Sequence, residues 1–150
     1  MNYWLMKSEP DVFSIDHLKK DKTTWWEGVR NYAARNSMQA MQPGDLVLFY
    51  HSSTDPSGIA GIAEVAKTAE PDKLQFDKKS EYYDPKATKE KPIWFCVQIK
   101  YSSTLKNYIS LDDIKKDPKC KDMVLIKRGR LSVQPVTKTE FDHLCKLGQK

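Results

Sequence analysis

The 150-residue sequence lacks an uninterrupted apolar run of about 18 residues, the length that a membrane-spanning helix needs. Its opening segment, Met1 to Lys7, is too short and too polar at its flanks for a secretion signal. Cysteine is scarce as well: Cys96, Cys120 and Cys145 are odd in number and widely spaced, and only three histidines accompany them. Without a Cys-x-x-Cys pair, this usage predicts neither a disulfide framework nor a zinc site. We therefore expect reduced thiols, no bound metal, no cofactor and no membrane partner.

The sequence also lacks the common catalytic motifs. It contains no Gly-x-Ser-x-Gly turn, no glycine-rich phosphate loop, no His-Glu-x-x-His helix and no zinc-deaminase signature. His51 is the one histidine inside a strand pattern, where a lone imidazole is more often packed or hydrogen-bonded than catalytic. We expect a protein without enzymatic activity. The alternative is an enzyme that acts on a nucleobase with Glu9 or His51 as acid or base.

Composition indicates a single globular domain over residues 1–150. Hydrophobic residues make up 39% and charged residues 30% of the chain, which is ordinary usage, and the length fits one core. The net charge of +5 is compatible with a polyanionic partner but does not require one.

Periodicity and turn signals predict strands and short helices in irregular alternation. Strands are expected at residues 3–6, 46–51, 59–66, 93–101 and 131–135, and helices after Ser14, over 31–41, from Ser110 to Pro118 and after Thr137. Residues 67–92 show no sustained period and predict a long excursion with little regular structure. At least five strands interleaved with helices favour a mixed α+β barrel.

Aromatic residues supply one candidate site. Adjacent side chains on a strand point to opposite faces, so Trp25 and Trp26 cannot both enter one core, and one of them is expected to be exposed or to line a cavity. A base removed from its stack needs a flat apolar sandwich, which Trp26, Phe49, Tyr50 and Trp94 could supply. The alternative is that these strand aromatics are simply core.

Arg30 precedes a predicted helix, where a cation opposes the helix dipole. An anion or acidic partner held there would explain the placement, and a phosphate fits both the guanidinium and the free helix N–H groups. Arg35 lies one turn after Asn31, so the two could form a polar ribbon along a nucleic-acid backbone. The alternative is a surface helix in which Arg30 pairs locally with Glu27 or Glu64.

Two further polar clusters could contact nucleic acid. Lys7 to Glu9 end a buried strand, where donors and acceptors can read a base edge or merely meet solvent. Lys127, Arg128 and Arg130 form a basic turn that could hold phosphates or remain a solvated loop.

Taken together, the motifs resemble the EVE domain family of the PUA-like group. The resemblance is carried in order by Met6-Lys7-Ser8-Glu9-Pro10, Trp26-Glu27-Gly28-Val29-Arg30-Asn31-Tyr32-Ala33-Ala34-Arg35-Asn36, Pro43-Gly44-Asp45, Phe49-Tyr50-His51-Ser52, Gly58-Ile59-Ala60-Gly61-Ile62-Ala63-Glu64-Val65, Tyr83-Asp84-Pro85-Lys86, Pro92-Ile93-Trp94 and Arg130-Leu131-Ser132-Val133-Gln134-Pro135. It implies a PUA-like β-barrel of about five to six strands with short flanking helices, and kinship with YTH readers of methylated adenine.

The resemblance also implies a function. It suggests a pocket for a modified nucleobase, with 5-substituted cytosine in DNA as the ligand class and Trp26 stacking on the flipped base. An RNA-binding module that reads a modified nucleotide in tRNA or rRNA is the alternative. Since the sequence lacks the basic N-terminal tail of nuclear relatives, a bacterial cytosol is the expected setting, or the nucleus in a eukaryote.

Carried over by motif, the base-pocket residues are Lys7, Ser8, Glu9, Trp26, Val29, Arg30, Asn31, Phe49, Tyr50, His51 and Ser132. The residues expected to contact the nucleic-acid backbone are Arg35, Asn36, Lys127, Arg128 and Arg130.

Overall fold

The computed structural model of the chain describes residues 1–149. In chain order the elements are β1 (Tyr3–Ser8), α1 (Ile15–Asp21), β2 (Thr23–Trp25), α2 (Tyr32–Ala40), β3 (Leu46–His51), β4 (Gly58–Pro71), the 3-10 helix η1 (Lys73–Phe76), β5 (Phe95–Ser110), α3 (Leu111–Lys116), the 3-10 helix η2 (Pro118–Cys120), α4 (Val124–Lys127), β6 (Val133–Val136) and α5 (Lys138–Gln149). Within the described residues, every helix is too short or too polar to cross a membrane.

The strands form one six-stranded mixed sheet in the order β2-β5-β4-β3-β1-β6. Strands β1 and β3 pair in parallel and all other neighbours are antiparallel. The sheet curls, but its edge strands β2 and β6 do not pair with each other, so the predicted barrel is an open one. The mixed α+β class with five to six strands and short flanking helices is confirmed.

Two apolar cores lie on opposite faces of the sheet. Strand β1 shows why: Trp4 and Met6 point into one core and Leu5 into the other, because side chains alternate along a strand. Helix α2 contributes Met38 to the first core, and α5 contributes Leu144 to the second. A strand such as β3, which is buried on both faces, is therefore continuously apolar.

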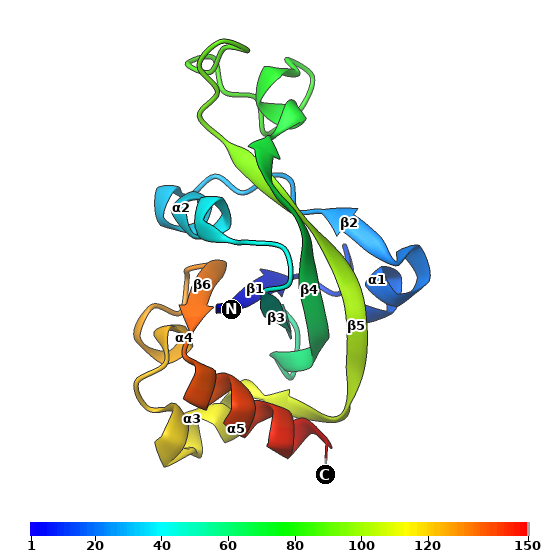
Figure 1. Cartoon of the computed structure of the whole chain (residues 1–150), viewed down its shortest axis with the longest axis vertical. Helices are drawn as coiled ribbons and strands as arrows, with labels where there is room; N and C mark the ends of the chain where they lie inside the picture. Colours follow the sequence, from blue (N-terminus) through cyan, green and yellow to red (C-terminus); the bar gives the residue numbers. More distant parts are fainter. Residues whose placement is uncertain (150) are drawn as a thin grey trace.

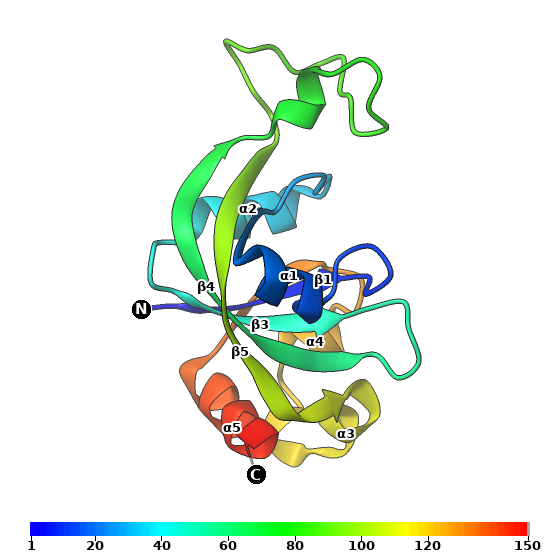
Figure 2. The same ribbon diagram turned by 90° about the vertical axis from the view of Figure 1, so that its right-hand side faces the viewer.

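Strands β4 and β5 are longer than the sequence predicts, and their ends project beyond the barrel. Figures 1 and 2 show this pair rising to a separate green segment, residues 72–94, which we call the lobe. The expectation of little regular structure from residue 67 is wrong in its first part, because β4 continues to Pro71. That end of β4 is mostly exposed, as Lys67 and Thr68 are, so no apolar period marks it.

The predicted helix starts are confirmed by their caps. The hydroxyl of Ser14 accepts from the backbone N–H of His17 at the start of α1. Thr137 and Glu140 form the reciprocal capping box of α5, with distances of 3.0 and 3.1 Å. Strand β2 and helix α4 were not predicted, because three or four residues are too few to show a period.

Candidate nucleic-acid interface

A cleft of about 420 Å³ opens between the loop after β1 and the segment that follows β2. The residues of the predicted base pocket that line it are Lys7, Ser8, Trp26, Val29, Arg30 and Ser132. The residues that line it without having been predicted as pocket residues are Val12, Phe13, Thr24, Trp25, Glu27 and Gly28. Two neighbouring segments, residues 7–13 and 24–30, and the distant Ser132 therefore build one cleft.

Both tryptophans of the adjacent pair contribute to this cleft. Trp26 is 9% exposed, and its backbone N–H donates to the carbonyl of Val97 at 2.9 Å. Its ring meets Phe49 edge to face, with centroids 5.7 Å apart and planes at 88°. Trp25 is half-buried and pairs with Gln98 at the sheet edge. Trp26 is thus part of the core and of the cleft wall at once.

Three predicted sandwich partners of Trp26 do not line the cleft. Phe49 is fully buried, so it supports Trp26 from behind and has no face free for a ligand. Trp94 is buried as well, and its indole N–H donates to Asp84 at 2.8 Å. Tyr50 lines a neighbouring hollow instead. The sequence pattern could not separate these positions, because strand aromatics suit a core and a cavity equally.

His51 also lies outside the cleft. Its Nε2 accepts from the backbone N–H of Ile15 at 3.1 Å and so holds the start of α1. Burial lowers the pKa of His51 and outweighs the opposing effect of Asp16. The lowered pKa favours the neutral ring, whose Nε2 can accept this bond. The imidazole therefore stabilises the start of α1 and lies away from the cleft. This position argues against a role for His51 as acid or base in the cleft.

Polar groups at the end of β1 are held in fixed positions. The Lys7 ammonium donates to the carbonyl of Gly129, and the Lys7 backbone N–H donates to the carbonyl of Ser132 at 2.9 Å. Burial lowers the pKa of Lys7. The Ser8 hydroxyl donates to the carbonyl of Phe13 at 2.6 Å, so its oxygen remains able to accept. These groups can meet a polar ligand edge without rearranging.

Arg30 has an acidic partner within the chain. Its Nη1 donates to Oδ2 of Asp72 at 3.1 Å, and the same oxygen accepts from the backbone N–H of Gly28 at 2.8 Å. Nε and Nη2 of Arg30 donate to the carbonyl of Tyr82 at 3.1 and 3.0 Å. The expected partners Glu27 and Glu64 are therefore wrong: Arg30 pairs with Asp72, which is 42 residues away, and Glu64 pairs with Lys100.

A surface track continues from the cleft toward the basic turn. Lys7 and Ser132 line both the cleft and a hollow of about 460 Å³ that also contains Glu9. Gly129 and Arg130 join that hollow to a further one of about 270 Å³. The residues that line this last hollow are Asn31, Arg128, Gly129, Arg130 and Leu131.

The remaining predicted backbone contacts are distributed differently. Lys127 is exposed and 3.7 Å from Asp122. Arg35 donates to the carbonyl of Ile93 at 3.0 Å, so it lies against the lobe and not on the track. It also donates to the side-chain oxygen of Asn36. The side chain of Asn31 caps α2 by accepting from Ala34. A continuous ribbon of Asn31 and Arg35 does not form.

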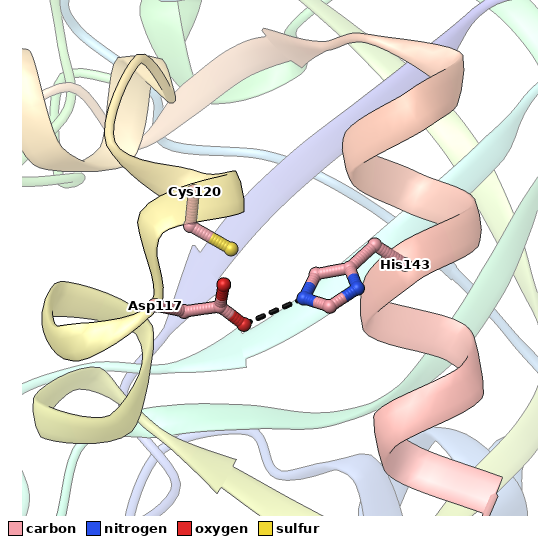
Figure 3. A group of neighbouring side chains, drawn as sticks. All are labelled: Asp117, Cys120 and His143. Atoms are coloured by element: carbon pink, nitrogen blue, oxygen red, sulfur yellow. Dashed lines mark hydrogen bonds and ion pairs between the residues drawn. The ribbon is translucent and has the colours of Figure 1, made fainter.

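A cluster of potential metal ligands lies at the contact of η2 and α5, shown in Figure 3. The ligand atoms of Asp117, Cys120 and His143 lie within 4.8 Å of one another, and Nε2 of His143 is 2.5 Å from Oδ2 of Asp117. Burial raises the pKa of Cys120 to about 11, so its thiol is protonated at neutral pH. The other carboxylate oxygen of Asp117 accepts from Lys119 at 2.9 Å. We interpret the cluster as a contact that docks α5.

The profile of the EVE domain family matches residues 2–147 of this sequence. The chain belongs to the EVE domain family. It is 40% identical to thymocyte nuclear protein 1 of Homo sapiens over 168 residues, which span 99% of this chain and 75% of the human protein. The resemblance drawn from the motifs is confirmed.

Solved structures match the EVE fold of the chain closely. A hypothetical protein from Leishmania major is 49% identical with a TM-score of 0.94, and the match covers 99% of this chain and 94% of the other. The human THYN1 protein, solved in complex with DNA containing 5-methylcytosine, is 40% identical with a TM-score of 0.94. That match covers 100% of this chain and 99% of the human one.

Proposed function

We propose that this EVE domain is a non-catalytic reader of modified cytosine in DNA that takes the flipped base into the cleft beside Trp26. The observation that carries the proposal is the preformed cleft, which combines an indole wall with fixed polar groups from β1. The human relative, similar over the whole chain, was solved with DNA that contains 5-methylcytosine, which supports this ligand class.

The cleft suits an extruded base on physical grounds. Stacking on an aromatic wall is worth about 1–3 kcal/mol, and Trp26 is fixed by its packing on Phe49. Lys7 and Ser8 would contact the polar edge of the base. A fitted apolar wall would distinguish the 5-methyl group by about 1–3 kcal/mol.

The track through the basic turn would hold the DNA backbone. Arg128 and Arg130 are exposed, and Arg130 lines the hollow that adjoins the cleft. Phosphate contacts of this kind add affinity that falls with salt and carries no sequence information. In a eukaryote we expect this reader in the nucleus, and in a bacterium in the cytosol.

The test is a titration with fluorescent duplexes that differ only in one cytosine, either methylated or plain, together with the matching RNA. We expect the methylated DNA to bind about 5- to 150-fold more tightly than plain DNA. Equal affinity for both duplexes would defeat the proposal, and tighter binding of the modified RNA would favour the alternative.

A variant series assigns the binding to the cleft. Trp26→Ala removes core packing of about 3–5 kcal/mol as well as the stacking wall, so its folding needs to be checked by circular dichroism. Ser8→Ala is the milder partner, since Ser8 is only partly buried. Folded Trp26→Ala should lose the preference for methylated DNA. Ser8→Ala should weaken methylated and plain DNA alike, because Ser8 contacts the polar edge that both bases share. Arg128→Gln should keep the preference.

A further inference from the structure

A cluster of aromatic rings and guanidinium groups lies beside the cleft, and the base-reading proposal gives its rings no role. We call this cluster the aromatic ledge; its members are Arg30, Tyr32, Arg35, Tyr82 and Trp94. The rings of Tyr32 and Trp94 stack with centroids 4.9 Å apart and planes at 29°. Cζ of Arg30 is 5.4 Å from the ring centroids of both Tyr82 and Trp94. Cζ of Arg35 is 4.9 Å from that of Tyr32. The five groups form one connected cluster of ring and cation–π contacts.

The ledge borders the cleft directly. Arg30 belongs to both, since it lines the cleft and contacts two ledge rings. Gly28, another cleft residue with φ +85°, meets the ring of Tyr82 so closely that an added Cβ would lie 3.0 Å from two ring carbons. Tyr82 therefore packs on the backbone at the edge of the cleft.

The outer rings of the ledge are open to a ligand. Tyr32 is 59% and Tyr82 37% exposed, although large apolar groups are usually buried. Trp94 is buried, stacks on Tyr32 and is fixed by the bond from its indole N–H to Asp84. The exposed rings of Tyr32 and Tyr82 are therefore available to stack on a flat ligand.

Hydrogen bonds from their guanidinium N–H groups hold the two arginines of the ledge in place. Arg30 donates to Asp72 and to the carbonyl of Tyr82, and Arg35 donates to the carbonyl of Ile93. Both guanidinium groups are consequently pre-oriented beside the rings, where they attract electron-rich faces. This arrangement differs from a phosphate clamp, in which the same N–H edges would face the ligand.

We propose that the aromatic ledge stacks the nucleotide next to the modified base on the same strand. Flipping a base removes stacking from its neighbour, and an aromatic platform replaces that stacking for any base because every base has a π face. The neighbour is the first nucleotide to reach the ledge, since Arg30 belongs to both the ledge and the cleft and Tyr82 packs on Gly28 at the edge of the cleft. This inference rests on the proposed base-reading function of the cleft.

The test places the fluorescent base 2-aminopurine next to 5-methylcytosine in a short DNA duplex. Stacking on a tyrosine is expected to quench its emission when the wild-type protein binds. Tyr32→Ala and Tyr82→Ala should reduce this quenching and weaken binding about 5- to 100-fold. Their affinity for free 5-methyl-2′-deoxycytidine, which fills only the cleft, should stay within about twofold of wild type.

A matched control is Tyr108→Ala. Tyr108 is 39% exposed like Tyr82, but its hydroxyl donates to the carbonyl of Pro56 and its ring lies outside the ledge. This variant should leave both the quenching and the affinity unchanged. Tyr82→Leu, which keeps apolar bulk without a π face, serves where Tyr82→Ala does not fold.

The outcomes separate the two proposals. If folded Tyr32→Ala and Tyr82→Ala keep the quenching and the duplex affinity of the wild-type protein, the ledge proposal is overturned and the cleft proposal is not affected. Equal losses for the duplex and the free nucleoside would also overturn it, because the ledge would then act only by shaping the cleft. Retained nucleoside binding in Trp26→Ala would instead count against the cleft itself.

Discussion

Asp72 connects the lobe to the cleft, and its removal should have a large effect. Its carboxylate is fully buried and accepts from Gly28, from Leu74 and from Arg30. In Asp72→Asn, the amide NH₂ replaces one oxygen and faces at least one of these donors, while Arg30 loses its counter-charge. An unpaired buried donor costs about 1–3 kcal/mol, and a broken buried ion pair about 3–5 kcal/mol. Because the Arg30 side chain is 20% exposed, solvent offsets part of the second cost.

We expect a net destabilisation of about 3 kcal/mol, which for a chain of this size lowers Tm by about 6–12 °C. Urea unfolding and thermal melting followed by circular dichroism measure both quantities. Asp77→Asn is the control, since this exposed lobe carboxylate accepts only from Lys79 and should cost less than about 0.5 kcal/mol. A cost below about 1 kcal/mol for Asp72→Asn would refute the reasoning.

Three other predictions concern separate parts of the molecule. Burial lowers the pKa of His51 below its ordinary 6.5 in the folded protein. The contribution of His51 to stability should therefore be fully present above about pH 6.5 and fall toward lower pH, because the unfolded chain takes up the proton first. His51→Gln should flatten this slope in pH-dependent melts. Gly58→Ala should cost about 3 kcal/mol of stability in urea unfolding, because its Cβ would lie 2.2 Å from a carbonyl oxygen of β5. Gly129→Ala should be tolerated in the same measurement, because the nearest atom to its Cβ would be 3.9 Å away. Arg130→Gln should reduce the slope of log affinity against log salt by about 1 and weaken methylated and plain DNA equally; an unchanged slope would remove the basic turn from the interface.

Local signals predicted the elements well, because they depend on neighbours in the sequence. Ser14 and Thr137 have the side chains that satisfy free helix N–H groups, and both cap helices in the structure. The apolar strand at 46–51 was predicted with its observed bounds. These local signals missed β2, because it is too short to show a period and forms through its pairing with β5.

The candidate site was predicted only where its residues lie in contiguous motifs. Lys7, Ser8 and Trp26 reach the cleft as expected, but Phe49 does not, since β3 is buried on both faces and its alternation cannot show which face borders a cavity. The contribution of Val12 had no signal, because it lies in an irregular loop. Each of these outcomes depends on packing between segments and not on local propensity.

The pairing of Arg30 changes how affinity should be divided across the interface. From the sequence, a cation before a helix suggested a phosphate contact, but its N–H groups already bond to Asp72 and to the carbonyl of Tyr82. A guanidinium held in this way contributes its flat face and little counterion release. The salt-dependent part of DNA binding should therefore reside in the exposed turn of Arg128 and Arg130, and the part that persists at high salt in the cleft and the aromatic ledge.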